Sequence, residues 1–277
     1  MKLYGHSKAD LHYFETEHGS FVIKHGDNRL KLQVKKQKET RNALPESISH
    51  FIDIPCIIRQ DENSCVMPFC NGEHILDLLQ CGNITKIDFI IDSIFKFTEW
   101  EFNKSVLTSV TMKDFEHKLV SLKQCIYDKE IVNIIDDMLS IKFEDTFYVG
   151  ECHGDLTLDN MIFDNKIVLI DFLDTYLESP IQDLAKLMQS VNLQWEFVIS
   201  HKKYDYNKIS IGYEYMKKEI LSRCFYSALK WGISVFTLNL VYLINLIRIV
   251  PYISDKTVFY EAIKEIRRVY EDIKDSR

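Results

Sequence analysis

Beyond residue 75 the chain follows a helical pattern almost to its end, with one interruption at residues 147–170. Residues 87–102 show the pattern best, because apolar residues recur there on one helix face. Within the interruption, residues 148–149 and 167–170 resemble short buried strands set among polar loops. The larger part of the chain is therefore predicted to be a helical lobe with one short β-strand insertion.

The first 70 residues have a different pattern. Residues 9–15 and 20–24 predict a hairpin, because a turn-forming segment that ends in Gly19 separates them. A charged helix is expected over residues 29–44, just before Pro45, and a second strand pair over residues 56–59 and 64–67. We therefore predict an α+β fold with two lobes. A small β-rich lobe spans residues 1–70, and a larger helical lobe spans residues 71–277.

Composition excludes several classes of protein. The formal net charge is -7, from 34 basic and 41 acidic residues, so the chain lacks the basic character that nucleic acid binding requires. Seven cysteines are scattered without C-x-x-C spacing, which argues against a disulfide framework or a zinc site. Free thiols of this kind suit the reducing cytoplasm, and we expect that location.

The most apolar stretch of the chain is residues 231–250. It contains Asn239, Asn245 and Arg248, so a buried helix of the helical lobe is favoured over a transmembrane span. The N-terminal residues also lack the apolar core of a signal peptide. No membrane insertion is expected, and the pattern gives no prediction of the oligomeric state.

Three polar residues in and beside the interruption have the spacing that phosphoryl transfer requires. Asp155 could accept the proton of an attacking hydroxyl, while Asn160 and Asp171 offer an amide and a carboxylate oxygen to Mg²⁺. Asp171 directly follows the apolar residues 167–170, so it is expected at a strand end near Asn160. A metal-dependent phosphohydrolase would need further histidine ligands, and the other histidines form no cluster.

The sequences HGDLTLDN at residues 153–160, IDF at 170–172 and DLA at 183–185 together resemble the aminoglycoside phosphotransferase and choline kinase superfamily. This resemblance implies a bilobal protein-kinase-like fold that uses ATP and Mg²⁺. It implies that Asp155 is the catalytic base and that Asn160 and Asp171 bind the metal. It also implies that His153 and Asp183 support the catalytic loop.

The resemblance extends less firmly to the nucleotide-binding residues. Lys24 ends the second predicted strand, where the related kinases place a lysine on the α- and β-phosphates, and Glu39 is its predicted ion-pair partner, with Glu46 in reserve. The loop before the first strand contains a single glycine, and Ser7 is the predicted phosphate contact there. Backbone groups of Met67 and Phe69 are expected to bind the adenine.

The acceptor is predicted only as a small molecule with a hydroxyl. Asp174, Glu178 and Trp195 are the candidate contacts, with Tyr176, Gln189 and Glu196 beside them. A sugar of surface-saccharide metabolism is the working hypothesis, and choline-like amino alcohols and aminoglycosides are the alternatives. A protein kinase is disfavoured, because the H-R-D, D-F-G and A-P-E sequences are missing. A catalytically silent nucleotide-binding protein is the alternative of another class.

Overall fold

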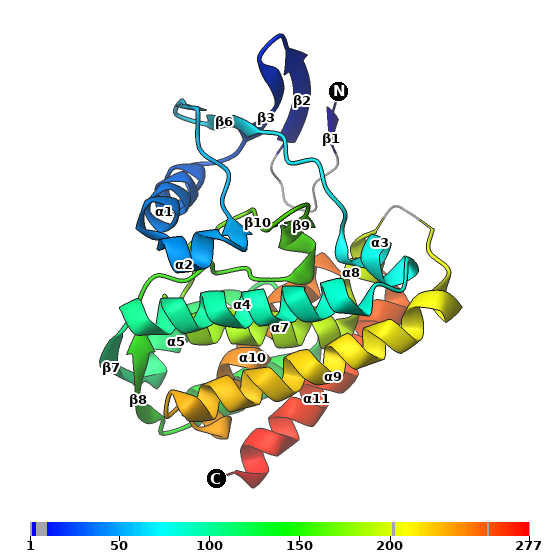
Figure 1. Ribbon diagram of the computed structural model, residues 1–277. Helices are drawn as coiled ribbons and strands as arrows, with labels where there is room; N and C mark the ends of the chain where they lie inside the picture. Colours follow the sequence, from blue (N-terminus) through cyan, green and yellow to red (C-terminus); the bar gives the residue numbers. More distant parts are fainter. Residues whose placement is uncertain (1, 4–9, 201–202, 254, 277) are drawn as a thin grey trace. The chain divides into compact units, whose positions relative to one another are not determined.

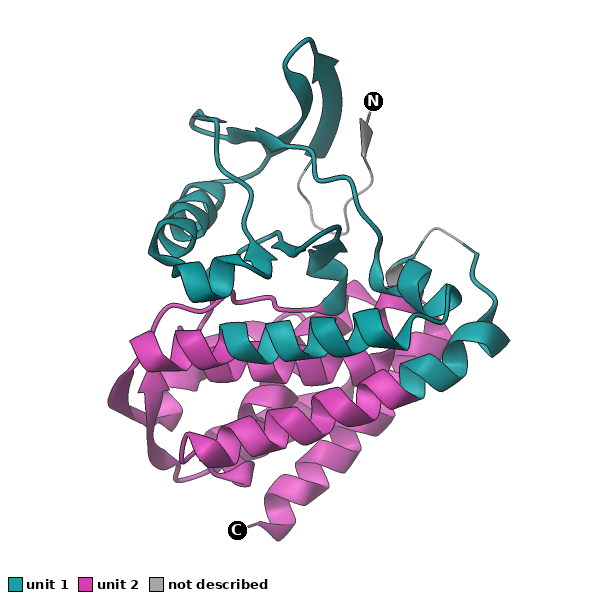
Figure 2. Ribbon diagram, in the orientation of Figure 1, with its two compact units in different colours: residues 1–97, 158–174, 199–214 teal, residues 98–157, 175–198, 215–277 magenta. Residues whose placement is uncertain are grey.

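The computed structural model describes residues 2–3, 10–200, 203–253 and 255–276. The chain divides into two compact units (Figure 2). Unit 1 contains residues 1–97, 158–174 and 199–214, and unit 2 contains residues 98–157, 175–198 and 215–277. Each unit therefore combines segments that are far apart in the sequence. The lobe boundary near residue 70 stays a prediction.

An antiparallel five-stranded sheet forms the first part of unit 1, in the order β1-β2-β3-β6-β5 (Figure 1). Its strands are β1 (Lys2–Leu3), β2 (Asp10–Thr16), β3 (Gly19–His25), β5 (Arg59–Gln60) and β6 (Ser64–Pro68). Gly19 closes the β2–β3 turn with φ +127°, a conformation that favours glycine. The predicted hairpin is present, although Ala9 lies outside the described residues. The second strand pair is present as well, but β5 covers Arg59 and Gln60, so only Arg59 of the strand predicted over residues 56–59 lies in it.

Helix α1 (Leu30–Ala43) packs on this sheet through a narrow stripe. Leu30 and Val34, one turn apart, form a buried cluster with Cys65 of β6. Three polar residues of α1 are buried as well, namely Lys36, Gln37 and Thr40. The helix ends before Pro45, as predicted, and the short α2 (Glu46–Ser49) follows.

A second sheet in unit 1 pairs distant segments in the order β4-β10-β9. Strand β4 (Ile52–Asp53) runs parallel to β10 (Ile167–Leu169), which forms a hairpin with β9 (Met161–Phe163). Gly72 lies against this hairpin so closely that a Cβ there would be 2.5 Å from the carbonyl oxygen of Phe163. Helices α3 (Ile75–Gln80) and α4 (Ile84–Lys104) follow, and the boundary between the units falls within α4 after residue 97.

Unit 2 is mainly helical. Its β7 (Val106–Thr111) and β8 (Glu144–Val149) form an antiparallel pair, and α5 (Met112–Lys123) and α6 (Lys129–Ser140) lie between them in sequence. The later helices are α7 (Pro180–Leu193), α8 (Trp195–Ile199), α9 (Tyr206–Lys230), α10 (Val235–Ile249) and α11 (Lys256–Asp275). The first part of α9, up to residue 214, belongs to unit 1. Helix α7 is buried along nearly its whole length and packs against α10 and α11.

The apolar stretch at residues 231–250 is divided between a turn and α10. Gly232, with φ +68°, separates α9 from α10, and the Ser234 hydroxyl accepts a hydrogen bond from the Thr237 amide to cap α10. Residues Val235–Tyr252 are apolar and long enough to cross a membrane, with a mean hydropathy of 1.5, but 72% of this window is buried inside the protein. This burial agrees with the predicted core helix.

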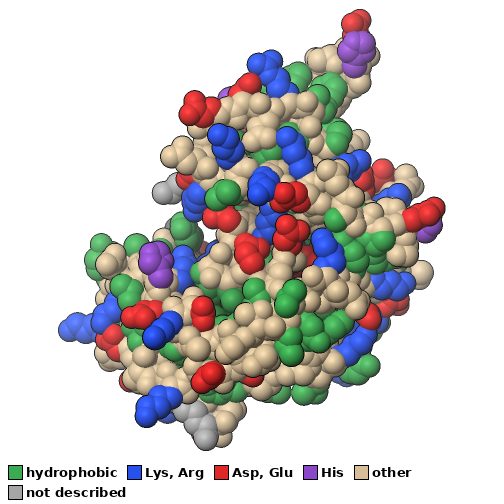
Figure 3. Space-filling model, turned by 90° about the vertical axis from the view of Figure 1, so that its left-hand side faces the viewer, with side chains coloured by type: hydrophobic (Ala, Val, Ile, Leu, Met, Phe, Trp, Pro, Cys, Tyr) green, Lys and Arg blue, Asp and Glu red, His purple; other side chains and the backbone are tan. Residues whose placement is uncertain are grey.

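The order of elements confirms the predicted α+β class, because strands dominate the N-terminal region and helices most of the remainder. On the face drawn in Figure 3, basic and acidic side chains are mixed rather than gathered by sign.

Candidate active site

The predicted metal ligands Asn160 and Asp171 flank the β9–β10 hairpin. Asn160 ends the short 3₁₀ helix η1 (Leu158–Asn160), and Asp171 comes two residues after β10. The amide of Ile170 donates a hydrogen bond to the carbonyl of Asn160 over 3.1 Å, which continues the pairing of Leu169 with Met161. The hairpin therefore brings Asn160 and Asp171 to the same end, as the sequence predicted.

Asp171 has an unusual backbone conformation. Its φ is +61°, in the left-handed region that residues other than glycine seldom adopt, and such outliers cluster at functional sites. Its Oδ1 atom accepts a hydrogen bond from Nζ of Lys24 over 2.9 Å. Lys24 is buried on β3, so this ion pair joins the five-stranded sheet to the end of the hairpin.

The donor atoms at this end of the hairpin fit Mg²⁺. Magnesium prefers oxygen ligands and is commonly bound through one or two side chains, with phosphate oxygens and waters completing its shell. The Asp171 carboxylate and the Asn160 side-chain amide can supply such oxygens. No group of three or more His, Cys, Asp and Glu that could hold a metal ion occurs among the described residues.

In unit 2, the segment around Asp155 is fixed by Asp183. The buried Asp183 carboxylate accepts hydrogen bonds from the amides of His153, over 2.6 Å, and Gly154, over 2.8 Å. Asp183 lies in the first turn of α7, where a negative charge also interacts favourably with the helix dipole. Gly154 has φ +86°, which glycine adopts without strain.

The side chain of Asp155 forms an ion pair with Lys186 of α7. Lys186 Nζ lies 2.9 Å from Asp155 Oδ1, and the lysine side chain is only 7% exposed. Burial raises the pKa of Asp155, but the charge of Lys186 and its hydrogen bond outweigh this effect, so that the pKa is lowered. Asp155 is therefore ionised at neutral pH, the form in which a carboxylate can accept a proton.

A partly buried polar network connects α7 to α10 in the same unit. The Tyr176 hydroxyl and the Asn245 side-chain amide both donate hydrogen bonds to Oε1 of Gln182, over 3.0 and 2.8 Å. Arg248 Nη1 donates to Oδ1 of Asn245 over 3.0 Å, and the guanidinium lies 5.4 Å from the centre of the Tyr176 ring.

Neither Lys186 nor Arg248 was predicted as a site residue. Lys186 lies three residues after Asp183, among the apolar residues Leu184, Ala185, Leu187 and Met188, and this placement was the one indication of its role in the sequence. Arg248 was read only as a residue that disfavours a membrane span. Its approach to Tyr176 depends on the packing of α10 on α7, which no motif encodes.

The predicted pairing of Lys24 with Glu39 is wrong. Glu39 lies on the exposed side of α1 and approaches Lys35, one turn away, at 3.8 Å, whereas Lys24 pairs with Asp171. The inward face of α1 presents Lys36 instead, whose Nζ donates to the carbonyl of Leu173 over 2.7 Å. Glu39 is the sole glutamate between residues 18 and 45, but it does not lie on the inward face of the helix. Glu46, the reserve, begins α2 and is exposed.

The predicted adenine contacts are only partly available. The Phe69 amide already donates to the carbonyl of Ser20 over 2.9 Å, and Met67 is paired with Val22 within the sheet. These amides are used by the β3–β6 ladder, so a nucleotide base would have to use the Phe69 carbonyl or the residues after it. Ser7 lies outside the described residues.

The predicted acceptor contacts are divided between the units. Asp174 is half-buried in unit 1, while Glu178 and Trp195 are half-buried in unit 2. Oε1 of Glu178 accepts a hydrogen bond from the Thr175 amide over 2.9 Å, and Oε2 lies 3.7 Å from Sγ of Cys152. Glu178 therefore holds its own loop in shape, and Asp174 and Trp195 stay predictions.

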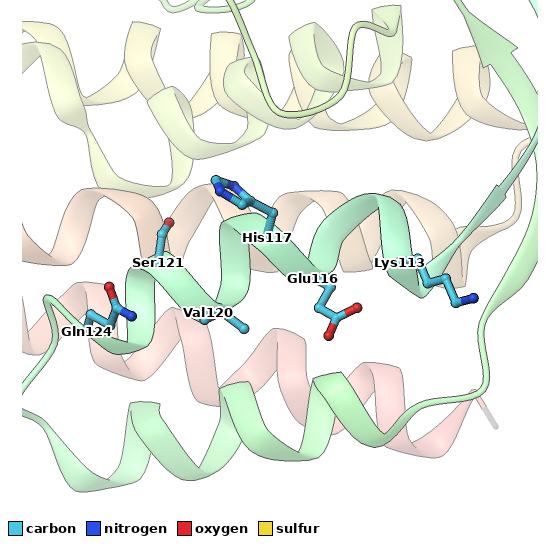
Figure 4. Close-up of a pocket in the computed structure, with 6 residues that line it drawn as sticks. All are labelled: Lys113, Glu116, His117, Val120, Ser121 and Gln124. Carbon is cyan, nitrogen blue, oxygen red and sulfur yellow. The ribbon is translucent and has the colours of Figure 1, made fainter.

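A pocket of about 410 Å³ lies along α5 (Figure 4). Its lining comes from α5 and the residue that follows it, and consists of Lys113, Glu116, His117, Val120, Ser121 and Gln124. None of these residues belongs to the predicted site, and they combine both charges without a common chemistry.

Comparison with known proteins supports the predicted class. Residues 129–210 match the model of the phosphotransferase enzyme family APH, and this segment includes the whole block from His153 to Ala185. The match confirms the resemblance drawn from the motifs and supports a phosphotransferase. No curated protein matches the chain at a significant level.

Solved structures share the fold at low sequence identity. The ADP-bound aminoglycoside phosphotransferase APH(2'')-Ib is 16% identical, with 98% of this chain and 93% of that chain covered and a TM-score of 0.53. A glucosamine kinase is 9% identical, with 100% and 94% covered and a TM-score of 0.55. LicA in complex with AMP is 14% identical, with 99% and 90% covered and a TM-score of 0.54. The chain thus has the protein-kinase-like fold of these enzymes.

Proposed function

We propose that this protein transfers the γ-phosphoryl group of ATP, bound with Mg²⁺, to a hydroxyl of a small molecule. The observation that best supports the proposal is the arrangement around Asp155. Its loop is fixed by the two hydrogen bonds to Asp183, and its carboxylate is kept ionised by Lys186. An ionised carboxylate on a rigid loop is what a general base requires.

In the proposed reaction, Asp155 accepts the proton of the acceptor hydroxyl as its oxygen attacks the γ-phosphorus. The new O–P bond forms, and the bond from phosphorus to the β,γ-bridging oxygen breaks. ADP leaves with that electron pair, and the products are a phosphate monoester and ADP. Asp155 returns its proton to solvent afterwards. Positioning and charge stabilisation supply most of the rate in reactions of this type.

Unit 1 is proposed to hold the nucleotide. Asn160 and Asp171 would bind Mg²⁺, which neutralises phosphate charge when it is present. Lys24 would either turn from Asp171 toward the α- and β-phosphates or contact Asp171 and these phosphates at the same time. Ser7 and Phe69 remain proposed contacts, Phe69 through its carbonyl, whereas Met67 is no longer proposed because its backbone is paired with Val22 in the sheet. Asn160 follows Asp155 by five residues, so their Cα atoms are at most about 18 Å apart by chain geometry.

The finer assignments are proposals as well. The acceptor is proposed to be a sugar of surface-saccharide metabolism, with Asp174 and Trp195 among its contacts, and amino alcohols and aminoglycosides are the alternatives. We also propose a cytoplasmic enzyme, with a nucleotide-binding lobe at residues 1–70 and the catalytic loop and acceptor site within residues 71–277.

Two measurements test the proposal. Thermal unfolding with millimolar ATP and Mg²⁺ should give a higher Tm than either ligand alone. A coupled assay of ADP release, with a panel of sugars and amino alcohols, should then find an acceptor-dependent rate. Absence of any nucleotide stabilisation would contradict the kinase assignment. Stabilisation without turnover on any acceptor would favour the silent nucleotide-binding protein.

A further inference from the structure

The guanidinium of Arg248 has unused hydrogen-bonding capacity. Its Nη1 donates to Asn245, and its plane lies near the Tyr176 ring, but Nε and Nη2 donate no hydrogen bond within the described part of the chain. No carboxylate among the described residues forms an ion pair with it. A half-buried arginine without an acidic partner is uncommon, because burial of an unpaired charge is costly.

Arg248 is connected to the residues around the proposed catalytic base. Asn245 joins it to Gln182 of α7, and Lys186, the partner of Asp155, lies one helical turn after Gln182 on the same face. Its charge also lowers the pKa of both Asp155 and Lys186. Arg248 therefore acts electrostatically on the same part of unit 2 as Asp155.

The neighbouring acidic groups are already satisfied. Asp183 accepts two backbone amides, Glu178 accepts the Thr175 amide, and Asp155 is paired with Lys186. By contrast, Nε2 of Gln182 is fully buried and has no hydrogen-bond partner among the described residues. The network thus offers unused donors, on Arg248 and Gln182, but no unused carboxylate.

We infer that the acceptor carries an anionic group, a carboxylate or a phosphate, which binds the open edge of the Arg248 guanidinium. This inference rests on the proposed function and narrows its substrate class. The planar guanidinium donates two parallel hydrogen bonds to such groups. The cationic side chains beside Asp155 would repel a cationic acceptor, so aminoglycosides and choline-like compounds are disfavoured.

A matched set of sugars tests the inference. Glucuronate, glucose 1-phosphate, glucose and glucosamine share one ring and differ in charge, and phosphorylated product is measured by mass spectrometry with Mg·ATP and the full chain. We expect kcat/KM for at least one of the two anionic sugars to exceed that for glucose and glucosamine by about tenfold or more. The two anionic compounds distinguish a carboxylate from a phosphate.

Substitution of Arg248 is the second test of the inference. Arg248→Gln should lower kcat/KM for the anionic acceptor about 10- to 100-fold, mainly through KM, and Arg248→Lys should recover part of the loss. Arg267→Gln is the matched control, because it removes an exposed arginine of the same unit that pairs with Glu130. Circular dichroism establishes that each variant is folded. If Arg248→Gln is not folded, Arg248→Lys takes its place as the test variant.

The outcomes separate the inference from the proposed function. Preference for glucose or glucosamine would overturn the anionic acceptor and leave phosphotransfer intact, whereas failure to bind Mg·ATP would overturn phosphotransfer itself. If Mg·ATP binds and no sugar reacts, the binding of glucuronate and of inorganic phosphate is measured by calorimetry. The protein is saturated with a non-hydrolysable ATP analogue in this experiment. Binding that Arg248→Gln weakens at least tenfold supports the inference, and equal binding or none contradicts it.

Discussion

Nζ of Lys24 lies 2.9 Å from Oδ1 of Asp171, although 147 residues separate them in the chain. The pair links the five-stranded sheet of unit 1 to the end of the β9–β10 hairpin. Because Asp171 also has a left-handed backbone conformation, its side chain is held in a direction that an ordinary strand end would not give.

Replacement of Asp171 should remove metal-dependent nucleotide binding. We expect Asp171→Ala to abolish the binding of Mg·ATP, because the carboxylate oxygen proposed for the metal is lost. Calorimetry with and without Mg²⁺ measures this. Asp164→Ala, in the turn of the same hairpin, is the control and should bind normally. Unchanged Mg²⁺ dependence in Asp171→Ala would exclude Asp171 as a ligand.

Replacement of Asp155 should affect turnover rather than binding. Asp155→Asn keeps the size of the side chain but cannot accept the proton, so kcat should fall roughly 10²-fold or more, the scale of general base catalysis. The affinity for Mg·ATP should change little. Steady-state kinetics and calorimetry measure the two quantities, and normal turnover by this variant would mean that Asp155 is only a loop residue.

Asp183 should contribute mainly to stability. Asp183→Ala leaves the buried amides of His153 and Gly154 without their acceptor, and we expect a loss of about 2–4 kcal/mol in the free energy of unfolding. Urea unfolding measures the loss. Asp183→Asn retains one acceptor oxygen and should lose less. Equal stability of all three proteins would show that solvent replaces the carboxylate.

Lys186 should set the acid limb of the pH–rate profile. The lowered pKa of Asp155 stabilises the fold above the pKa of an unfolded aspartate, and this contribution is lost as pH falls through the folded-state pKa. In Lys186→Met, burial acts without its partner, so the pKa of Asp155 rises. The acid limb of kcat/KM should move up by about one pH unit or more.

The same variant should also lose stability at neutral pH. Removal of one partner of a buried ion pair typically costs about 3–5 kcal/mol, and the loss should shrink at acidic pH as Asp155 becomes protonated. Lys264→Met, on the exposed side of α11, is the control. A profile identical to the wild type would mean that Lys186 does not influence Asp155.

Sequence-based prediction and structure agree on local elements and disagree on the orientation of α1 and on the backbone of Phe69. Local patterns predicted the β2–β3 hairpin and α1, because turn residues and apolar spacing act over a few positions. The same patterns could not show that α1 turns Lys36 inward and Glu39 outward, because its amphipathicity is weak. Backbone groups of Met67 and Phe69 were likewise predicted to bind adenine, but the Phe69 amide is used by the β3–β6 ladder.

Order and spacing along the chain by themselves predicted the α+β class, a phosphotransferase and the candidate set Asp155, Asn160 and Asp171. Phosphoryl transfer needs a base and oxygen ligands at particular spacings, and a hairpin converts that spacing into proximity. Only the tertiary structure decided the partners of the charged groups. Lys24 with Asp171, Lys186 with Asp155 and the open guanidinium of Arg248 all depend on how distant elements pack, and no local pattern encodes that packing.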